Sequence, residues 1–181
     1  MKIKNTTTHY GLFSIGVHWL TVVLIAVLFP LGLIMVDLDY YDSGYQTYPH
    51  IHKSLGLLLF SLTIGRMLWV FLLSKPPSAL PQPRLLHLLA KSVHHLLYLC
   101  LLLIPVSGYL ISTADGRSTD VFNWFSVPAL FAPFKSQADI AGNIHATAAW
   151  GLITLITLHT VGALKHHFIN KDRTLKRMFG R

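Results

Sequence analysis

Four long runs of apolar residues, separated by shorter polar segments, dominate the pattern of this 181-residue chain. Each run is about 20 residues long, the length that an α-helix needs to cross the hydrocarbon layer of a bilayer. The runs predict four membrane-spanning helices, at about 17–36, 52–73, 93–113 and 145–168. We therefore expect residues 1–181 to form one membrane domain, an all-α four-helix bundle.

Composition agrees with a protein embedded in the lipid bilayer, because 52% of the residues are hydrophobic and only 12% are charged. A formal net charge of +8 could indicate a nucleic-acid partner. The basic residues are instead gathered in particular loops, which is typical of membrane topology and argues against nucleic acid.

Basic residues gather at the two chain ends and in the second loop, whereas acids predominate in the first and third loops. The positive-inside rule therefore predicts that both termini are cytoplasmic, N-in and C-in. The basic residues concerned are Lys2, Lys4, Lys75, Arg84, Lys91, Lys165, Lys171, Arg173, Lys176, Arg177 and Arg181, and the acids are Asp37, Asp39, Asp42, Asp115, Asp120 and Asp139.

The third loop contains an aromatic and proline-rich stretch at 122–134, FNWFSVPALFAPF. Its prolines argue against a fifth span. Aromatic residues favour the membrane–water interface, so we expect this stretch to lie on the outer surface of the membrane. A lid over an outer cofactor is the alternative.

Histidines in the predicted spans occur at two depths. His145 and His159 are fourteen residues apart, which is nearly four helical turns, so both leave one face about 21 Å apart along the axis. His18 matches the depth of His159, and His52 matches that of His145. The sequence therefore predicts two histidine pairs, one near each membrane surface.

Each pair could hold one haem iron between two imidazoles, an arrangement that favours electron transfer over oxygen chemistry. Ionisable side chains within membrane helices are costly and indicate function, although any one of them could be a hydrogen-bonded core residue. Zinc fits less well, because it prefers three or four ligands at one depth. With Cys100 as the single cysteine and no CxxCH motif, the haems would be bound non-covalently.

Arg66 lies fourteen residues after His52, on the same predicted face. No acid lies at its depth, so we expect a haem propionate to be its partner; snorkelling to the headgroups is the alternative. Small residues follow three of the histidines by four positions and leave room for a flat macrocycle or for close helix packing. They are Gly56, Ala149 and Ala163.

The remaining histidines have less specific environments. His94 and His95 are expected to open the third helix, where His94 would contact a haem edge or propionate, or replace His18 as a ligand. His166 or His167, at the end of the last helix, could line a quinone site or anchor the helix at the interface. Three others are expected in solvated loops: His9, His50 and His87.

These residues resemble the bacterial di-haem cytochrome b561 family over nearly the whole chain. The similar segments are HW at 18–19, IHKSLG at 51–56, HHLLYL at 94–99, SGYLISTADG at 107–116 and KHHFINKDRTLKRM at 165–178, with Arg66, His145 and His159. The family is related to the cytochrome b subunits of hydrogenases and formate dehydrogenases.

The resemblance implies a multi-pass protein of the bacterial inner membrane with two non-covalent b haems. It implies His18, His52, His145 and His159 as axial ligands. It also implies electron transfer linked to ubiquinone or another membrane quinone, with Arg66 and His166 as candidates for the quinone pocket.

Three functions are compatible with the sequence. An enzyme would pass electrons from a periplasmic donor, with superoxide as one candidate, to quinone; Lys53, Arg117 and Lys135 would attract an anion. A cytochrome b subunit would dock a larger redox complex or a periplasmic redox protein, and the acids at 37–42 would suit a basic partner. A haem-free transporter or metal carrier is the third, and a helix broken near the midplane would support it.

Overall fold

The computed structural model describes residues 2–73 and 83–180. Lys75 and Arg181, two of the basic residues used to predict topology, lie outside this part of the chain. The described elements are α1 (Leu12–Val36), α2 (Thr47–Leu68), which continues as the π-helical turn η1 (Trp69–Leu73), α3 (Arg84–Ser112), β1 (Thr119–Val121), β2 (Phe125–Val127), α4 (Gln137–Phe168) and the short α5 (Thr174–Arg177).

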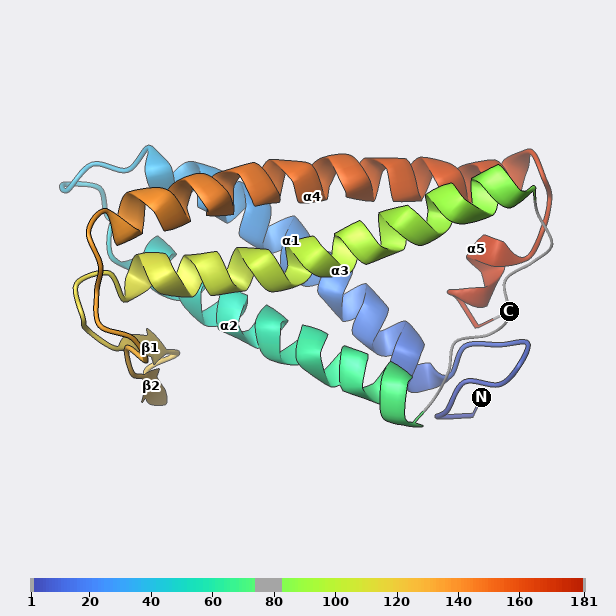
Figure 1. The fold of residues 1–181 in the computed structure, drawn as a ribbon, viewed down its shortest axis with the longest axis horizontal. Coiled ribbons are helices and arrows are strands. Elements are labelled where there is room, and N and C mark those ends of the chain that lie inside the picture. Colours follow the sequence, from blue (N-terminus) through green and yellow to red (C-terminus); the bar gives the residue numbers. More distant parts are fainter. Residues whose placement is uncertain (1, 74–82, 181) are drawn as a thin grey trace.

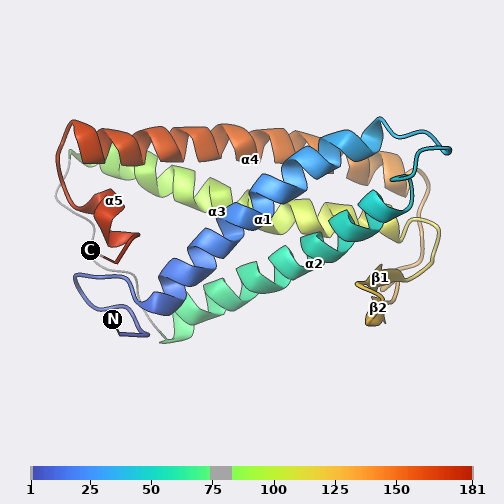
Figure 2. The ribbon, with the colours of Figure 1, turned by 180° about the vertical axis from the view of Figure 1, so that it is seen from behind.

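The four long helices form one bundle, in which α3 packs along α4 and α1 along α2, while α2 also contacts α3. Both views show the chain ends together at one end of the bundle and the β-hairpin at the other (Figure 1, Figure 2). All four helices are long and apolar enough to cross a membrane. The predicted all-α, four-helix membrane fold is therefore confirmed, while the cytoplasmic position of the termini stays a prediction.

Apolar side chains cover the outside of the bundle as well as its centre. Val23, Leu58, Leu99 and Leu158 are exposed although they lie in the middle of spans, as expected of residues that face lipid rather than water. The centre is a small cluster to which every long helix contributes. It consists of Leu24, Leu28, Leu59, Leu101 and Leu152.

The helices begin earlier than their apolar runs predicted, by nine residues in α3 and eight in α4. The runs mark only the hydrocarbon layer, whereas a helix of about 30 residues also crosses the headgroup regions. Pro83 immediately precedes α3, and proline is well tolerated where a helix starts, because the first N–H groups have no helical partner.

Three predictions about histidines were therefore wrong. His50 and His87 lie inside α2 and α3 rather than in loops. Pro49 occupies the first turn of α2, where proline does not interrupt helical bonding, so the helix continues through His50. His94 and His95 lie almost three turns into α3 and do not open it.

The third loop forms an antiparallel hairpin in which Thr119 pairs with Val127 and Val121 with Phe125. No fifth membrane-length helix occurs among the described residues, as predicted. The hairpin is fixed to the bundle, because the N–H of Phe122 donates to the fully buried Ser54 hydroxyl at 3.0 Å. Ser54 lies two residues after His52, so the hairpin sits at the end of the bundle that carries this histidine.

Candidate functional site

The hairpin end of the bundle brings together His52 of α2 and His145 of α4. Their ring centroids are 6.2 Å apart and their planes are inclined by 62°. The two helices therefore bring these rings close together, as the depth argument predicted.

The opposite end brings together His18 of α1 and His159 of α4. Their ring centroids are 6.5 Å apart with an interplanar angle of 66°. The two pairs thus have nearly the same separation, although the partner of the α4 histidine comes from α2 in one pair and from α1 in the other.

A shared separation of this size fits a metal ion held between two imidazoles. A metal–nitrogen bond of about 2 Å plus about 1.1 Å from nitrogen to ring centre, on each side, gives centroids roughly 6.2 Å apart. Such rings would each present one nitrogen to the same ion. The geometry of both pairs therefore fits a bis-imidazole haem iron.

The two pairs are separated by an apolar layer. On α4, Leu152 lies seven residues from both His145 and His159, so all three lie along one inward face. Leu152 belongs to the central leucine cluster and is 5% exposed. The structure therefore has two separate polar sites with packed hydrocarbon between them.

The ring of His145 is oriented by α3. Its Nδ1 lies 2.9 Å from the backbone carbonyl of Ile104 and 3.3 Å from the Ser107 hydroxyl. Because a carbonyl only accepts, Nδ1 carries the proton and Nε2 retains its lone pair. Histidine ligands to metals are commonly held in this way by a backbone carbonyl.

Glycines make room for both rings of the outer pair. A Cβ on Gly108 of α3 would lie 3.1 Å from Cε1 of His145, and a Cβ on Gly32 of α1 would lie 3.1 Å from Cε1 of His52. The Nδ1 atom of His52 is buried without a hydrogen-bond partner. The backbone of Leu28 lies close enough to the ring to interact with it electrostatically. The His52 ring is thus held mainly by packing.

Small residues beside the histidines were predicted to admit a macrocycle or to allow close helix packing. A Cβ on Gly56 would meet no atom within 4 Å, so no neighbouring helix packs against this glycine. The space beside Gly56 fits the prediction that these small residues admit a macrocycle. Ala149 and Ala163 are half-buried. This degree of burial does not distinguish room for a macrocycle from close helix packing.

His94 lies beside the inner pair, next to His159. Its ring centroid lies 5.1 Å from that of His159, which is about 1 Å too close for a metal ion held between two imidazoles. The Nδ1 atom of His94 donates to the carbonyl of Ala90 at 2.6 Å. His94 therefore packs against the inner pair from the side.

Arg66 also reaches the inner pair. It lies close enough to His18 and His159 to interact with them electrostatically, and its guanidinium stands 5.6 Å from the ring centroid of Tyr98. No acid among the described residues forms an ion pair with it. A cation held without a carboxylate fits the prediction that the partner is a haem propionate.

The described residues hold no group of three or more histidine, cysteine, aspartate or glutamate side chains that could bind a metal ion. Zinc normally needs such a group.

The helices α1 and α3 continue through their internal prolines, Pro30 and Pro105. Neither of these two helices is broken at the midplane, the feature that would favour a transporter.

A cavity of about 580 Å³ opens around the start of α2. Its lining includes the basic residues Lys53 and Arg117, together with His50. Lys135, which we expected to act with them, does not line it. Arg117 is also paired with Asp115 at 2.6 Å, so part of its charge is compensated.

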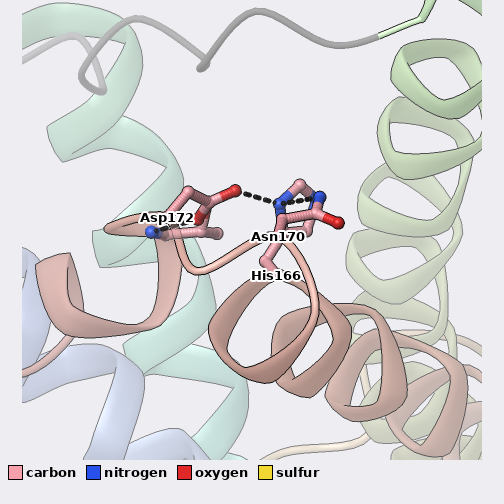
Figure 3. A network of polar contacts seen from close by, with 4 residues as sticks. His166, Asn170 and Asp172 are labelled. Carbon is pink, nitrogen blue, oxygen red and sulfur yellow. Dashed lines mark hydrogen bonds and ion pairs between the residues drawn. The ribbon is translucent and has the colours of Figure 1, made fainter.

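Beyond the inner pair, α4 ends at a small polar network. His166 lies seven residues after His159, so it continues the same inward face about 10 Å further along the axis. It contacts Asp172 in the connection to α5 (Figure 3). The adjacent His167 has a buried Nδ1 without a hydrogen-bond partner.

Several of these contacts were not predicted from the sequence. Glycine in an apolar helix was a visible signal at Gly32 and Gly108, because it costs helix stability and needs a packing reason. The Ile104 carbonyl carried no such signal. Asp172, the one acid in the basic tail, was noted only for its charge.

Comparison with known proteins agrees with this geometry. A family described as prokaryotic cytochrome b561 matches residues 9–181. Cytochrome b561 homolog 2 of Escherichia coli K12 is 47% identical over 182 residues, which cover 100% of this chain and 96% of the relative. Cytochrome b561 homolog 1 of the same strain is 29% identical, covering 93% of this chain and 95% of the relative.

A protein of Yersinia pestis named as a probable superoxide oxidase, CybB, is 30% identical, and the match covers 93% of this chain and 94% of the relative. The family match, the four spanning helices and the paired histidines point the same way. The chain belongs to the prokaryotic cytochrome b561 family, whose members are multi-pass proteins of the bacterial inner membrane that carry b-type haem and transfer electrons.

Proposed function

We propose that this protein binds two b haems and passes electrons across the inner membrane between a periplasmic donor and a membrane quinone. The observation that carries the proposal is the repeated separation of the two histidine pairs, 6.2 Å at the hairpin end and 6.5 Å at the other. Each bound haem would supply reversible one-electron transfer.

His52 and His145 would hold the iron of the outer haem, and His18 and His159 would hold that of the inner haem. The spacing of His145 and His159 along α4 supports one haem near each membrane surface. Arg66 would bind an inner propionate, and His94 would pack against the ring edge.

The orientation that we propose puts the termini and the inner pair in the cytoplasmic half, as the distribution of basic residues predicts. The hairpin and the basic cavity then face the periplasm. Lys53 and Arg117 line this cavity around the start of α2, which suits a small anionic donor. The relative named as a probable superoxide oxidase makes superoxide the first donor to test.

The quinone pocket that we propose lies at the other end, between Arg66 and His166. Both residues lie toward the cytoplasmic end of their helices, beyond or beside the inner pair. A cation and an imidazole can together hold and protonate a quinone oxygen. Ubiquinone is the acceptor to test first.

A count of haem tests the cofactor proposal. Purified protein should give a reduced-minus-oxidised spectrum of low-spin b haem, and a pyridine haemochrome assay should give two haems per chain. One haem per chain would contradict the double site. Protein that folds in an ample supply of haem and shows no Soret band would contradict haem binding altogether.

A second candidate function is that of an electron-transfer subunit that docks another redox protein. The observation that favours it is the exposed acidic loop between α1 and α2, with Asp37, Asp39 and Asp42. Gentle solubilisation followed by purification would separate the two functions. Co-purification of a stoichiometric redox partner supports the subunit, whereas a single polypeptide with donor-to-quinone activity supports the enzyme.

A further inference from the structure

The connection from α4 to α5 folds back so that an aspartate meets the last inward-facing histidine. Lys171 adopts a positive φ of 54°, which reverses the chain, and the N–H of Asp172 donates to the carbonyl of His166 at 3.1 Å. The side chains meet as well, with Nδ1 of His166 2.5 Å from Oδ2 of Asp172 (Figure 3).

Both carboxylate oxygens of Asp172 are used. Oδ2 contacts His166, and Oδ1 accepts the backbone N–H of Thr174 at 2.8 Å, at the start of α5. Burial disfavours the charged form of Asp172, but the hydrogen bonds from Thr174 and His166 outweigh it, so that the pKa is lowered from its ordinary value. Asp172 is therefore a carboxylate that can only accept.

This carboxylate decides which nitrogen of His166 carries the proton. Nδ1 also lies 3.3 Å from the side-chain amide nitrogen of Asn170, which as a donor would favour a bare Nδ1. The contact with Asp172 is much shorter, and a bare nitrogen there would be repelled by the carboxylate. Nδ1 of His166 is thus protonated, and Nε2, which bonds to no described residue, keeps its lone pair.

The segment that carries Asp172 is fixed to the helix that bears His18. Trp19, the next residue along α1, donates from Nε1 to the carbonyl of Met178 at 2.9 Å, and its ring packs on Phe179 at 5.0 Å. The tail from 170 to 180 therefore spans from α4 to α1 at the end of the bundle that holds the inner histidine pair.

We infer that Asp172 and His166 form a carboxylate–histidine dyad in which Asp172 is a positioning residue that makes His166 a proton donor and acceptor for the quinone. This inference rests on the quinone site proposed above. Reduction of a quinone takes two electrons, which the protein delivers, and two protons. Nε2 of His166 would first take a proton from cytoplasmic water, giving an imidazolium opposite Asp172, and would then pass that proton to a quinone oxygen, once for each of the two protons. Quinol oxidation would run the same transfers in reverse.

The Asp172→Asn variant separates this role from a structural one. Its Oδ1 can still accept the N–H of Thr174, so the hydrogen bond at the start of α5 is kept. Its amide nitrogen would donate to Nδ1 and move the histidine proton to Nε2. Asn in place of the Asp in a Ser–His–Asp triad acts in this way, leaving geometry intact while the tautomer is wrong.

The experiment compares full-length wild type with Asp172→Asn, Asp172→Glu and Asp172→Ala, with Asp139→Asn on the exposed first turn of α4 as the matched control. Reduced protein is mixed with a short-chain ubiquinone, which needs protons, or with ferricyanide, which does not. The Asn variant should lose about tenfold or more of its rate with ubiquinone while its ferricyanide rate stays close to that of wild type. Asp172→Glu should recover much of the loss.

A structural role predicts the opposite order, with Asp172→Asn like wild type and Asp172→Ala slowed with both acceptors. Either a wild-type ubiquinone rate in the Asn variant or an equal loss with ferricyanide would overturn the inference.

A second readout needs no quinone. Nitrogen NMR of ¹⁵N-histidine-labelled, reduced protein, assigned with His166→Gln, should show His166 protonated at Nδ1 in wild type and at Nε2 in Asp172→Asn. An Nε2 proton in wild type would overturn the dyad. Wild type that shows the Nδ1 proton but does not react with ubiquinone would instead refute the proposed acceptor.

Discussion

The Nδ1 atom of His145 donates to the backbone carbonyl of Ile104 at 2.9 Å, joining α4 to α3 at the outer histidine pair. The bond fixes the tautomer in which Nε2 keeps its lone pair. It also prevents the ring from rotating freely, since the carbonyl belongs to a helix backbone. The outer site is therefore organised by contacts between helices, whereas the inner site is organised by the close approach of several rings and Arg66.

The double site predicts that its two halves can be lost separately. His145→Ala should remove the outer haem and halve the haemochrome count, because His18 and His159 do not depend on this ring. His50→Ala, in the same region but outside the pair, should keep both haems. Loss of both haems from a folded His145→Ala protein would show that the pairing is wrong.

The glycine facing His145 predicts a more selective effect. Gly108→Ala places a methyl group 3.1 Å from Cε1 of His145, so the ring must shift away from Ile104. Overpacking of this kind costs about 1–3 kcal/mol, which should weaken retention of the outer haem roughly tenfold during competition with a haem-binding acceptor protein.

Gly151→Ala is the matched control for that substitution, because a Cβ there meets nothing within 4 Å. It should leave haem retention unchanged and stabilise α4 slightly, since alanine favours helix by up to about 1 kcal/mol over glycine. Equal effects of the two substitutions would mean that the position of His145 is not set by Gly108.

Arg66 should tune the inner haem through its charge. Removing a nearby cation disfavours the reduced form, so Arg66→Gln should lower the midpoint potential of one haem only, by an amount on the order of 1 kcal/mol. Arg66→Lys should keep most of the charge but lose the bidentate contact with a carboxylate. A redox titration that shows unchanged potentials in Arg66→Gln would indicate that Arg66 snorkels to the headgroups.

Much of this arrangement could be predicted from the sequence, because helical geometry is regular. The rise per residue related His145 to His159, and the positions of His52 and His18 in their predicted spans matched the depths of these two histidines. The structure brings each pair together. The spacing from His52 to Arg66 likewise placed the arginine near the inner pair.

Other features depend on where helices start, how they pack on one another and how the chain turns between them. The regular geometry of a single helix does not determine these. The first turns of α3 and α4 combine polar and apolar residues, so the apolar runs began too late to reveal where these helices start. The contact of His145 with Ile104 depends on how α3 is rotated and shifted against α4. The contact of His166 with Asp172 depends on one reversed residue, Lys171.

The basic cavity makes a prediction about the donor. Lys53 lines it and has no ion pair among the described residues, whereas Arg117 is partly compensated by Asp115. Lys53→Gln should therefore slow reduction of the protein by superoxide several-fold and reduce the dependence of that rate on ionic strength. Lys135→Gln removes the same charge away from the cavity and should have a smaller effect. Equal slowing by both substitutions would show that only the general charge of the outer surface attracts the donor, and a rate indifferent to salt in wild type would exclude electrostatic attraction of an anion at this end.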